Sequence, residues 1–134
     1  MIDSHCHLYE IPENEWANNG LEAMVCAGAD VESSKRAVEI ANKYENVYAT
    51  VGVHPEGIFN FQYSIYKQLL NLSKSKKVVA IGECGLNVGS EEEIKLFKFN
   101  IDLARETGLP LVVHCRNMFE KIFETLDYDK VQMH

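Results

Sequence analysis

Hydrophobic residues in this chain fall into two kinds of segment that follow one another. Short continuous apolar runs, such as 47–53 and 78–83, predict buried β-strands. Between such runs, apolar residues recur at helical spacing, as they do over 37–44. The strands are continuous rather than alternating in polarity, which is typical of a parallel sheet covered by helices. The expected strands are 1–8, 21–28, 47–53, 78–83, 111–114 and 131–134.

Residues that cap helices mark where several helices begin and end. Asp30 or Ser33 is expected to cap the helix that follows the second strand. Ser90 followed by Glu93 predicts a capping box, and Gly108 is expected to stop the helix that it opens. The other expected helices lie at roughly 63–73 and 118–126, and 10–20 is read as a polar connection.

The order of strands and helices predicts an α/β fold. Polar residues lie at the carboxyl ends of the strands, where active sites lie in a (β/α) barrel and in an open α/β sheet. No strand is followed by G-x-G-x-x-G or by a phosphate loop, which counts against an open dinucleotide-binding sheet.

Length and charge narrow the classes of function. The 134 residues are expected to form one domain spanning 1–134. The net charge of −7 argues against bulk attraction to nucleic acid or anionic membranes, although bound metal ions could supply local positive charge. We find no apolar run of bilayer length and no basic-then-apolar leader, so we expect a cytoplasmic protein with no membrane partner.

The four cysteines lie inside apolar runs and show neither a CxxC motif nor paired zinc spacing. We therefore predict buried, reduced thiols. Strand alternation points Cys6 and Cys115 away from the candidate ligands beside them.

The first strand ends in a His-x-His pair. Because side chains alternate along a strand, Asp3, His5 and His7 are expected on one face. Two neighbouring imidazoles on a rigid strand can hold a divalent cation, and Asp3 could orient one of them. An isolated pair of this kind would more often be two hydrogen-bonded polar residues, but later segments also end in residues of metal-binding type.

Candidate metal ligands therefore recur at strand ends. Histidines with a carboxylate suit zinc, manganese or a similar divalent ion. Glu83 has two oxygens and could bridge two ions about 3.5–4 Å apart, an arrangement that serves phosphoester hydrolysis. One ion would generate hydroxide from water, and the other would polarise the phosphoryl oxygen. The candidate ligands are His5, His7, Glu83, His114 and His134.

Two further polar residues are expected on the same side as these ligands. His54 follows the third strand, and we interpret it as a substrate or phosphate contact rather than a ligand. Arg116 follows His114 by two residues, and its planar guanidinium suits a phosphate oxygen. An ordinary salt bridge in a loop is nearly as good an interpretation of Arg116.

Four motifs together resemble the TatD family of metal-dependent hydrolases, within the amidohydrolase-like barrel superfamily. Their order and approximate spacing both match, and the similarity runs over the whole chain. The motifs are DSHCHL at 3–8, VGVHP at 51–55, IGECGL at 81–86 and LPLVVHCR at 109–116.

The resemblance implies a TIM-type (β/α)8 barrel of which this chain holds about six of eight strands. It also implies a divalent-metal phosphodiesterase that typically acts on DNA, a deoxyribonuclease with two ions of Zn, Mn or Mg. By the same resemblance, His5 and His7 bind one ion, Glu83 bridges and is the catalytic centre, and His114 and His134 serve the other ion.

This chain departs from the family pattern at four positions and in length. Asn87 and Asn117 stand where the family usually has aspartates, and Glu93 and Asn100 stand where it has glutamines. The family chain is about twice as long and ends with two more strands and a late metal-binding aspartate. We therefore expect a partial barrel: either a fragment of a longer protein, or a piece that another chain or a homo-oligomer completes.

Two alternatives to the nuclease remain open. An amidohydrolase-like enzyme could act on a small-molecule ester or amide, and a carboxylated lysine on the fourth strand would favour it, whereas this chain has Glu83 there. A truncated, non-catalytic relative would fit the two asparagines and the chain length, but the five candidate ligands oppose it.

Overall fold

Five parallel strands form one sheet, in the order β1-β2-β3-β4-β5. The structure is a computed structural model and describes residues 1–131. The strands are β1 (Ile2–Cys6), β2 (Ala23–Ala27), β3 (Val47–Val51), β4 (Val78–Leu86) and β5 (Leu111–Cys115). The helices are η1 (Leu8–Glu10), α1 (Glu13–Trp16), α2 (Val31–Lys43), η2 (Pro55–Asn60), η3 (Tyr63–Ile65), α3 (Tyr66–Leu72), α4 (Glu91–Thr107) and α5 (Phe119–Val131).

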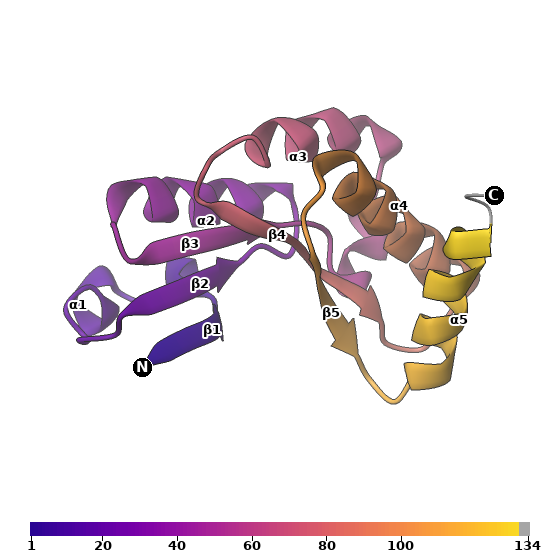
Figure 1. Ribbon diagram of the computed structural model, residues 1–134, viewed down its shortest axis with the longest axis horizontal. Coiled ribbons are helices and arrows are strands. Elements are labelled where there is room, and N and C mark those ends of the chain that lie inside the picture. Colours follow the sequence, from indigo (N-terminus) through magenta and orange to yellow (C-terminus); the bar gives the residue numbers. More distant parts are fainter. Residues whose placement is uncertain (132–134) are drawn as a thin grey trace.

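The sheet curls, because the strand direction rotates strongly between β1 and β5 (Figure 1). The longer helices follow one another along the outside of this curve, with α2 against α3, α3 against α4 and α4 against α5. Each strand therefore lies beside the next in the chain, and helices return the chain between most of them. This arrangement confirms the predicted α/β class and is part of a (β/α) barrel.

Two apolar clusters hold the helices to the sheet. The larger one joins β2–β4 to α2, α3 and α4, and Met24, Val51 and Leu103 are almost completely buried within it. The smaller one surrounds Phe97 of α4 and includes Ile122 of α5. Full burial of one such side chain contributes about 1.5–3 kcal/mol, so the apolar runs of the sequence account for both the strands and their helix cover.

The helix ends largely follow the sequence. Asp30 is the N-cap of α2, and Ser33 completes a capping box with it, so both candidates take part. Ser90 Oγ accepts from the Glu93 N–H, but the Glu93 carboxylate turns to the preceding loop instead of to Ser90. Gly108 ends α4 with φ of 71°, a left-handed conformation that glycine adopts without strain. No helix within residues 1–131 is long and apolar enough to cross a membrane.

Several predicted boundaries were wrong. β1 ends at Cys6, before His7, and the predicted polar connection 10–20 contains the short helix α1. β4 continues to Leu86, three residues beyond Glu83, because Gly85 and Leu86 pair with β5. The last helix is longer than expected and ends at Val131, so the sixth strand predicted at 131–134 does not begin there. The remainder of that predicted strand lies outside the described residues.

All four cysteines are free thiols, as predicted. Cys26 and Cys84 are buried, whereas Cys6 and Cys115 are only half-buried. Burial raises the pKa of the Cys6 thiol to about 12, and its Sγ donates to the Val25 carbonyl. A protonated thiol turned toward β2 is not a metal ligand, in agreement with the predicted alternation.

Candidate metal centre

Glu83 of β4 lies at the centre of four histidines. Its backbone N–H donates to the Gly28 carbonyl at 2.8 Å, directly after β2. The neighbouring carbonyl of Gly82 accepts from the buried Thr50 hydroxyl of β3 at 2.6 Å. One contact comes from β3, which is the neighbour of β4, and the other comes from the residue after β2. The Glu83 side chain is only 14% exposed, and these contacts fix the backbone that presents its carboxylate.

On one side of Glu83, the first ligand group joins His5, His7 and Glu83. The Nε2 atoms of His5 and His7 lie 3.2 Å and 3.9 Å from Glu83 Oε2. The other ring nitrogen of His7, Nδ1, lies 3.1 Å from the Ala27 carbonyl and 2.8 Å from the Tyr9 hydroxyl. With its hydrogen on Nδ1, donated to this carbonyl, the His7 ring would present its Nε2 lone pair toward Glu83.

Asp3 does not orient either ring. Its Oδ1 accepts from the backbone N–H of His5 at 3.1 Å, so the predicted role for Asp3 was wrong. The carboxylate is short and reaches the neighbouring backbone before it reaches a ring two residues away. The Ala27 carbonyl and Tyr9 take that role at His7 instead.

On the other side, the second ligand group joins His54, Glu83 and His114. His114 Nδ1 lies 3.2 Å from Glu83 Oε1, and His114 Nε2 lies 2.6 Å from Asn87 Oδ1. The His54 and His114 rings meet edge to face, with centroids 4.4 Å apart. Burial lowers the pKa of His54, and the neighbouring His114 lowers it further. His54 Nδ1 accepts from the Glu56 N–H at 3.2 Å, so the neutral ring carries its hydrogen on Nε2.

The structure thus brings together four of the five predicted ligands, and His54 with them. His54, predicted as a substrate contact, places a ring nitrogen within 4.8 Å of ligand atoms of Glu83 and His114. Arg116 has an exposed side chain, and its backbone N–H donates to the Leu86 carbonyl at 3.1 Å. His134 lies outside the described residues. The individual roles of these residues remain predictions.

Asn100 supports the site from α4, a role that the sequence did not suggest. This fully buried amide accepts from the Val53 N–H at 2.9 Å and donates to the Val53 carbonyl at 3.1 Å. It also donates to the Leu96 carbonyl of its own helix. Asn100 therefore fixes the residue immediately before His54. Two signals were available: a polar residue on the apolar face of a helix, and the position at which the family pattern has a glutamine.

β4 and β5 approach each other unusually closely beside the site. A Cβ added to Gly85 would lie 1.9 Å from the His114 carbonyl oxygen, and one added to Gly82 would lie 2.4 Å from the Val112 carbonyl oxygen. No side chain fits in either place. Glycines on both sides of Glu83 thus allow His114 to stand next to the carboxylate.

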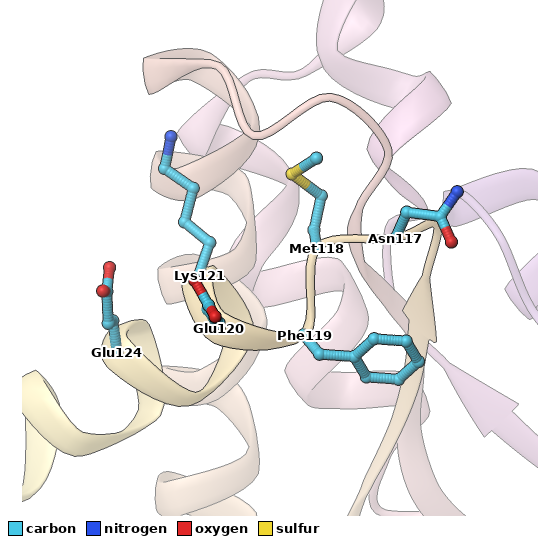
Figure 2. Close-up of a pocket in the computed structure, with 6 residues that line it drawn as sticks. All are labelled: Asn117, Met118, Phe119, Glu120, Lys121 and Glu124. Atoms are coloured by element: carbon cyan, nitrogen blue, oxygen red, sulfur yellow. The ribbon is translucent and has the colours of Figure 1, made fainter.

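A separate pocket of about 470 Å³ lies at the start of α5 (Figure 2). None of the four histidines lines it, and neither does Glu83, so it is distinct from both ligand groups. Lys121 extends from it to donate to the Gly89 carbonyl at 2.9 Å, which ties α5 to the loop after β4. The lining residues are Asn117, Met118, Phe119, Glu120, Lys121 and Glu124.

The donor set fits divalent metal ions. Imidazole nitrogens with a carboxylate suit zinc and similar first-row ions. Each Glu83 oxygen faces a different ligand group at 3.2 Å, as a bridging carboxylate requires. These contacts place acceptor atoms close to one another at a partly shielded position, an arrangement that a cation stabilises.

Comparison with known proteins gives consistent results. The sequence model of the family described as TatD related DNase matches residues 2–134. A 3'-5' ssDNA/RNA exonuclease TatD of Salmonella typhimurium is 29% identical over 113 residues, which cover 81% of this chain and 44% of the relative. An uncharacterized metal-dependent hydrolase of Methanocaldococcus jannaschii is 31% identical over 144 residues, which cover 98% of this chain and 57% of the relative. This chain spans about half the length of these relatives.

Solved structures agree on the fold. The crystal structure of YJJV, a TatD homolog from Escherichia coli K12, superposes with a TM-score of 0.82 at 25% identity, over 96% of this chain and 55% of that chain. An uncharacterized amidohydrolase from Saccharomyces cerevisiae superposes with a TM-score of 0.74 at 17% identity, over 93% of this chain and 50% of that chain. The second likeness shows the fold alone.

Proposed function

Because this chain belongs to the TatD related DNase family, we propose that it carries the metal-binding half of a divalent-metal-dependent nuclease. Its substrate would be a phosphodiester bond of single-stranded DNA or RNA, the substrate class named for the Salmonella relative. The observation that carries the proposal is the position of Glu83 between two ligand groups, with one oxygen directed to each.

Each side chain has a defined task in this proposal. Bound divalent ions would supply Lewis acidity and a water of lowered pKa. His5 and His7, with Glu83 Oε2, would hold one ion, and His114 and His54, with Oε1, would face the second. Glu83 joins the two positions and is the catalytic carboxylate. The net charge of −7 makes such ions the main local attraction for a polyanionic substrate.

The experiment compares cleavage of an end-labelled single-stranded DNA, and of the matching RNA, by chelator-treated protein before and after addition of Zn²⁺, Mn²⁺ or Mg²⁺. We expect cleavage only with metal, and a loss of at least about 100-fold in Glu83→Gln, on the scale of removing one transition-state stabiliser. Glu92→Gln, at an exposed position of α4, is the matched control and should cleave normally. Cleavage without metal, or full activity in Glu83→Gln, would refute the proposal.

The chain length supports a second candidate function, metal binding without catalysis by this chain alone. The chain covers only 44% and 57% of two relatives, so a nuclease of their kind would draw further residues from a longer or second chain. Zinc binding without cleavage, measured by calorimetry on the same preparation, would favour this function. The molar mass of the protein under assay conditions, measured by size-exclusion chromatography with light scattering, distinguishes a monomer from a homo-oligomer.

A further inference from the structure

The loop between β4 and α4 is organised around one buried carboxylate. Glu93, in the first turn of α4, is only 3% exposed. Its Oε2 accepts from three successive backbone N–H groups, those of Asn87, Val88 and Gly89, at 3.0, 3.0 and 2.8 Å. Hydrogen bonds to a carboxylate are stronger than neutral ones, so this oxygen fixes the backbone of the loop.

The capping of α4 does not require this arrangement. Ser90 already accepts from the Glu93 N–H at the helix start. Lys121 of α5 holds the same loop from outside by donating to the Gly89 carbonyl. The loop 87–89 is thus held by contacts from two helices. It directly follows β4, the strand that carries Glu83.

The first residue of this loop contacts His114. Asn87 Oδ1 lies 2.6 Å from His114 Nε2, while His114 Nδ1 lies 3.2 Å from Glu83 Oε1. A neutral imidazole has one N–H and one lone pair. If the N–H on Nε2 donates to Asn87, the lone pair on Nδ1 is directed to the Glu83 side.

We propose that Asn87 and Glu93 are positioning residues that select Nδ1 of His114 as its metal-binding nitrogen. This inference rests on the proposed metal-dependent function and assigns the atom that the second ligand group uses. Asn87 acts through its hydrogen bond to Nε2, and Glu93 acts by holding the backbone that presents Asn87. Neither residue is itself a ligand.

The first ligand group has the same kind of contact at His7, but there the other ring nitrogen, Nε2, faces Glu83. The Ala27 carbonyl takes the Nδ1 hydrogen of His7 and leaves Nε2 to face Glu83. In both groups, a hydrogen-bond acceptor on the side of the ring away from Glu83 determines which ring nitrogen is directed toward Glu83. Such partners typically change metal affinity by about 10–100-fold when removed.

The test uses the whole chain with ¹⁵N-labelled histidine. Zinc affinity is measured by calorimetry, and the coordinating nitrogen is identified from ¹⁵N spectra and from coupling to ¹¹³Cd. We expect Asn87→Ala to weaken metal binding by about 10–100-fold and to move coordination of His114 away from Nδ1 alone. Asn87→Asp, which can only accept, should retain coordination through Nδ1.

Two further variants separate positioning from folding. Glu93→Gln keeps a carbonyl oxygen for the loop N–H groups and should retain coordination through Nδ1, whereas Glu93→Ala should lose it. Asn87→Ala leaves the three N–H bonds to Glu93 intact, so it tests the inference even if Glu93→Ala does not fold. Glu92→Ala, exposed in the same helical turn, is the matched control.

Each outcome decides one claim. Coordination through Nδ1 alone in Asn87→Ala, at any affinity, would overturn the inference, as would coordination through Nε2 in the wild type. Absence of zinc or cadmium binding in the wild type would instead refute the proposed function. In that case the ¹⁵N spectra of the metal-free protein still test the contact, because Asn87→Ala should shift the Nε2 resonance of His114 and Glu92→Ala should not.

Discussion

The histidines on the two sides of Glu83 are supported by different kinds of structure. In the first ligand group, the His7 ring is held by the Ala27 carbonyl at the end of β2, with Tyr9 as a second partner. In the second ligand group, His114 is held by the side chain of Asn87, which belongs to a loop. A strand carbonyl keeps its position as long as the sheet is paired, whereas a loop side chain depends on further contacts.

The sheet itself does not distinguish the two groups. Within residues 1–131, β1 pairs only with β2 and β5 pairs only with β4, so the strands that carry His5 and His114 are both edge strands. The second ligand group nevertheless depends more on individual side chains, above all Glu93, Asn87 and Asn100. We expect substitutions there to have larger effects than comparable ones around His7.

The largest effect is expected from Gly85→Ala. The new Cβ would lie 1.9 Å from the His114 carbonyl oxygen, at a φ of +141°, so β4 and β5 would have to separate. We expect the free energy of unfolding to fall by more than about 4 kcal/mol, measured by urea denaturation. Gly20→Ala is the control, since its φ is +75° but no atom lies within 4 Å of its added Cβ. That variant should cost about 1–2 kcal/mol, and an equal loss in both would contradict the close-approach argument.

Glu83→Gln should weaken metal binding in both ligand groups at once, because each uses one oxygen of this carboxylate. We expect zinc affinity to fall by at least about 100-fold, or roughly 2.7 kcal/mol, with lower stoichiometry by elemental analysis. Glu92→Gln should change neither quantity. Loss of only one ion of two would show that Glu83 does not bridge.

Asn100→Ala should reduce stability and disturb His54 while leaving the first ligand group intact. The variant leaves the buried N–H and carbonyl of Val53 without their partner, which costs about 2–3 kcal/mol. Chemical denaturation measures this loss, and Asp102→Ala, at an exposed site on the same helix, should lie within about 0.5 kcal/mol of wild type. Equal stabilities of the two variants would contradict the role given to Asn100.

The smallest effect is expected from Tyr9→Phe. Removing the hydroxyl leaves the Ala27 carbonyl to accept from His7 Nδ1, so zinc affinity should fall by less than tenfold, about 1 kcal/mol. Calorimetry on Tyr9→Phe and Asn87→Ala side by side compares the two supports. If Tyr9→Phe lost as much affinity as Asn87→Ala, the two ligand groups would not differ as described.

Much of the fold followed from local rules applied to the sequence. Continuous apolar runs predicted parallel strands, and the His-x-His spacing predicted that the two rings lie side by side, which they do although β1 ends at Cys6. Glu83 and His114 were expected to meet because the carboxyl ends of neighbouring parallel strands share an edge. These predictions need only strand alternation and the order of the elements.

Contacts across the sheet and through the loops were decided only by the tertiary structure. The length of β4 depends on its register with β5, which pairs Gly85 with His114. The packing of α4 against β4 decides two further contacts. The Glu93 carboxylate accepts from the loop N–H groups, and Asn87 contacts His114 Nε2. A residue's type shows what it can bind, but which atom it binds depends on distances of a few tenths of an ångström between segments far apart in the chain.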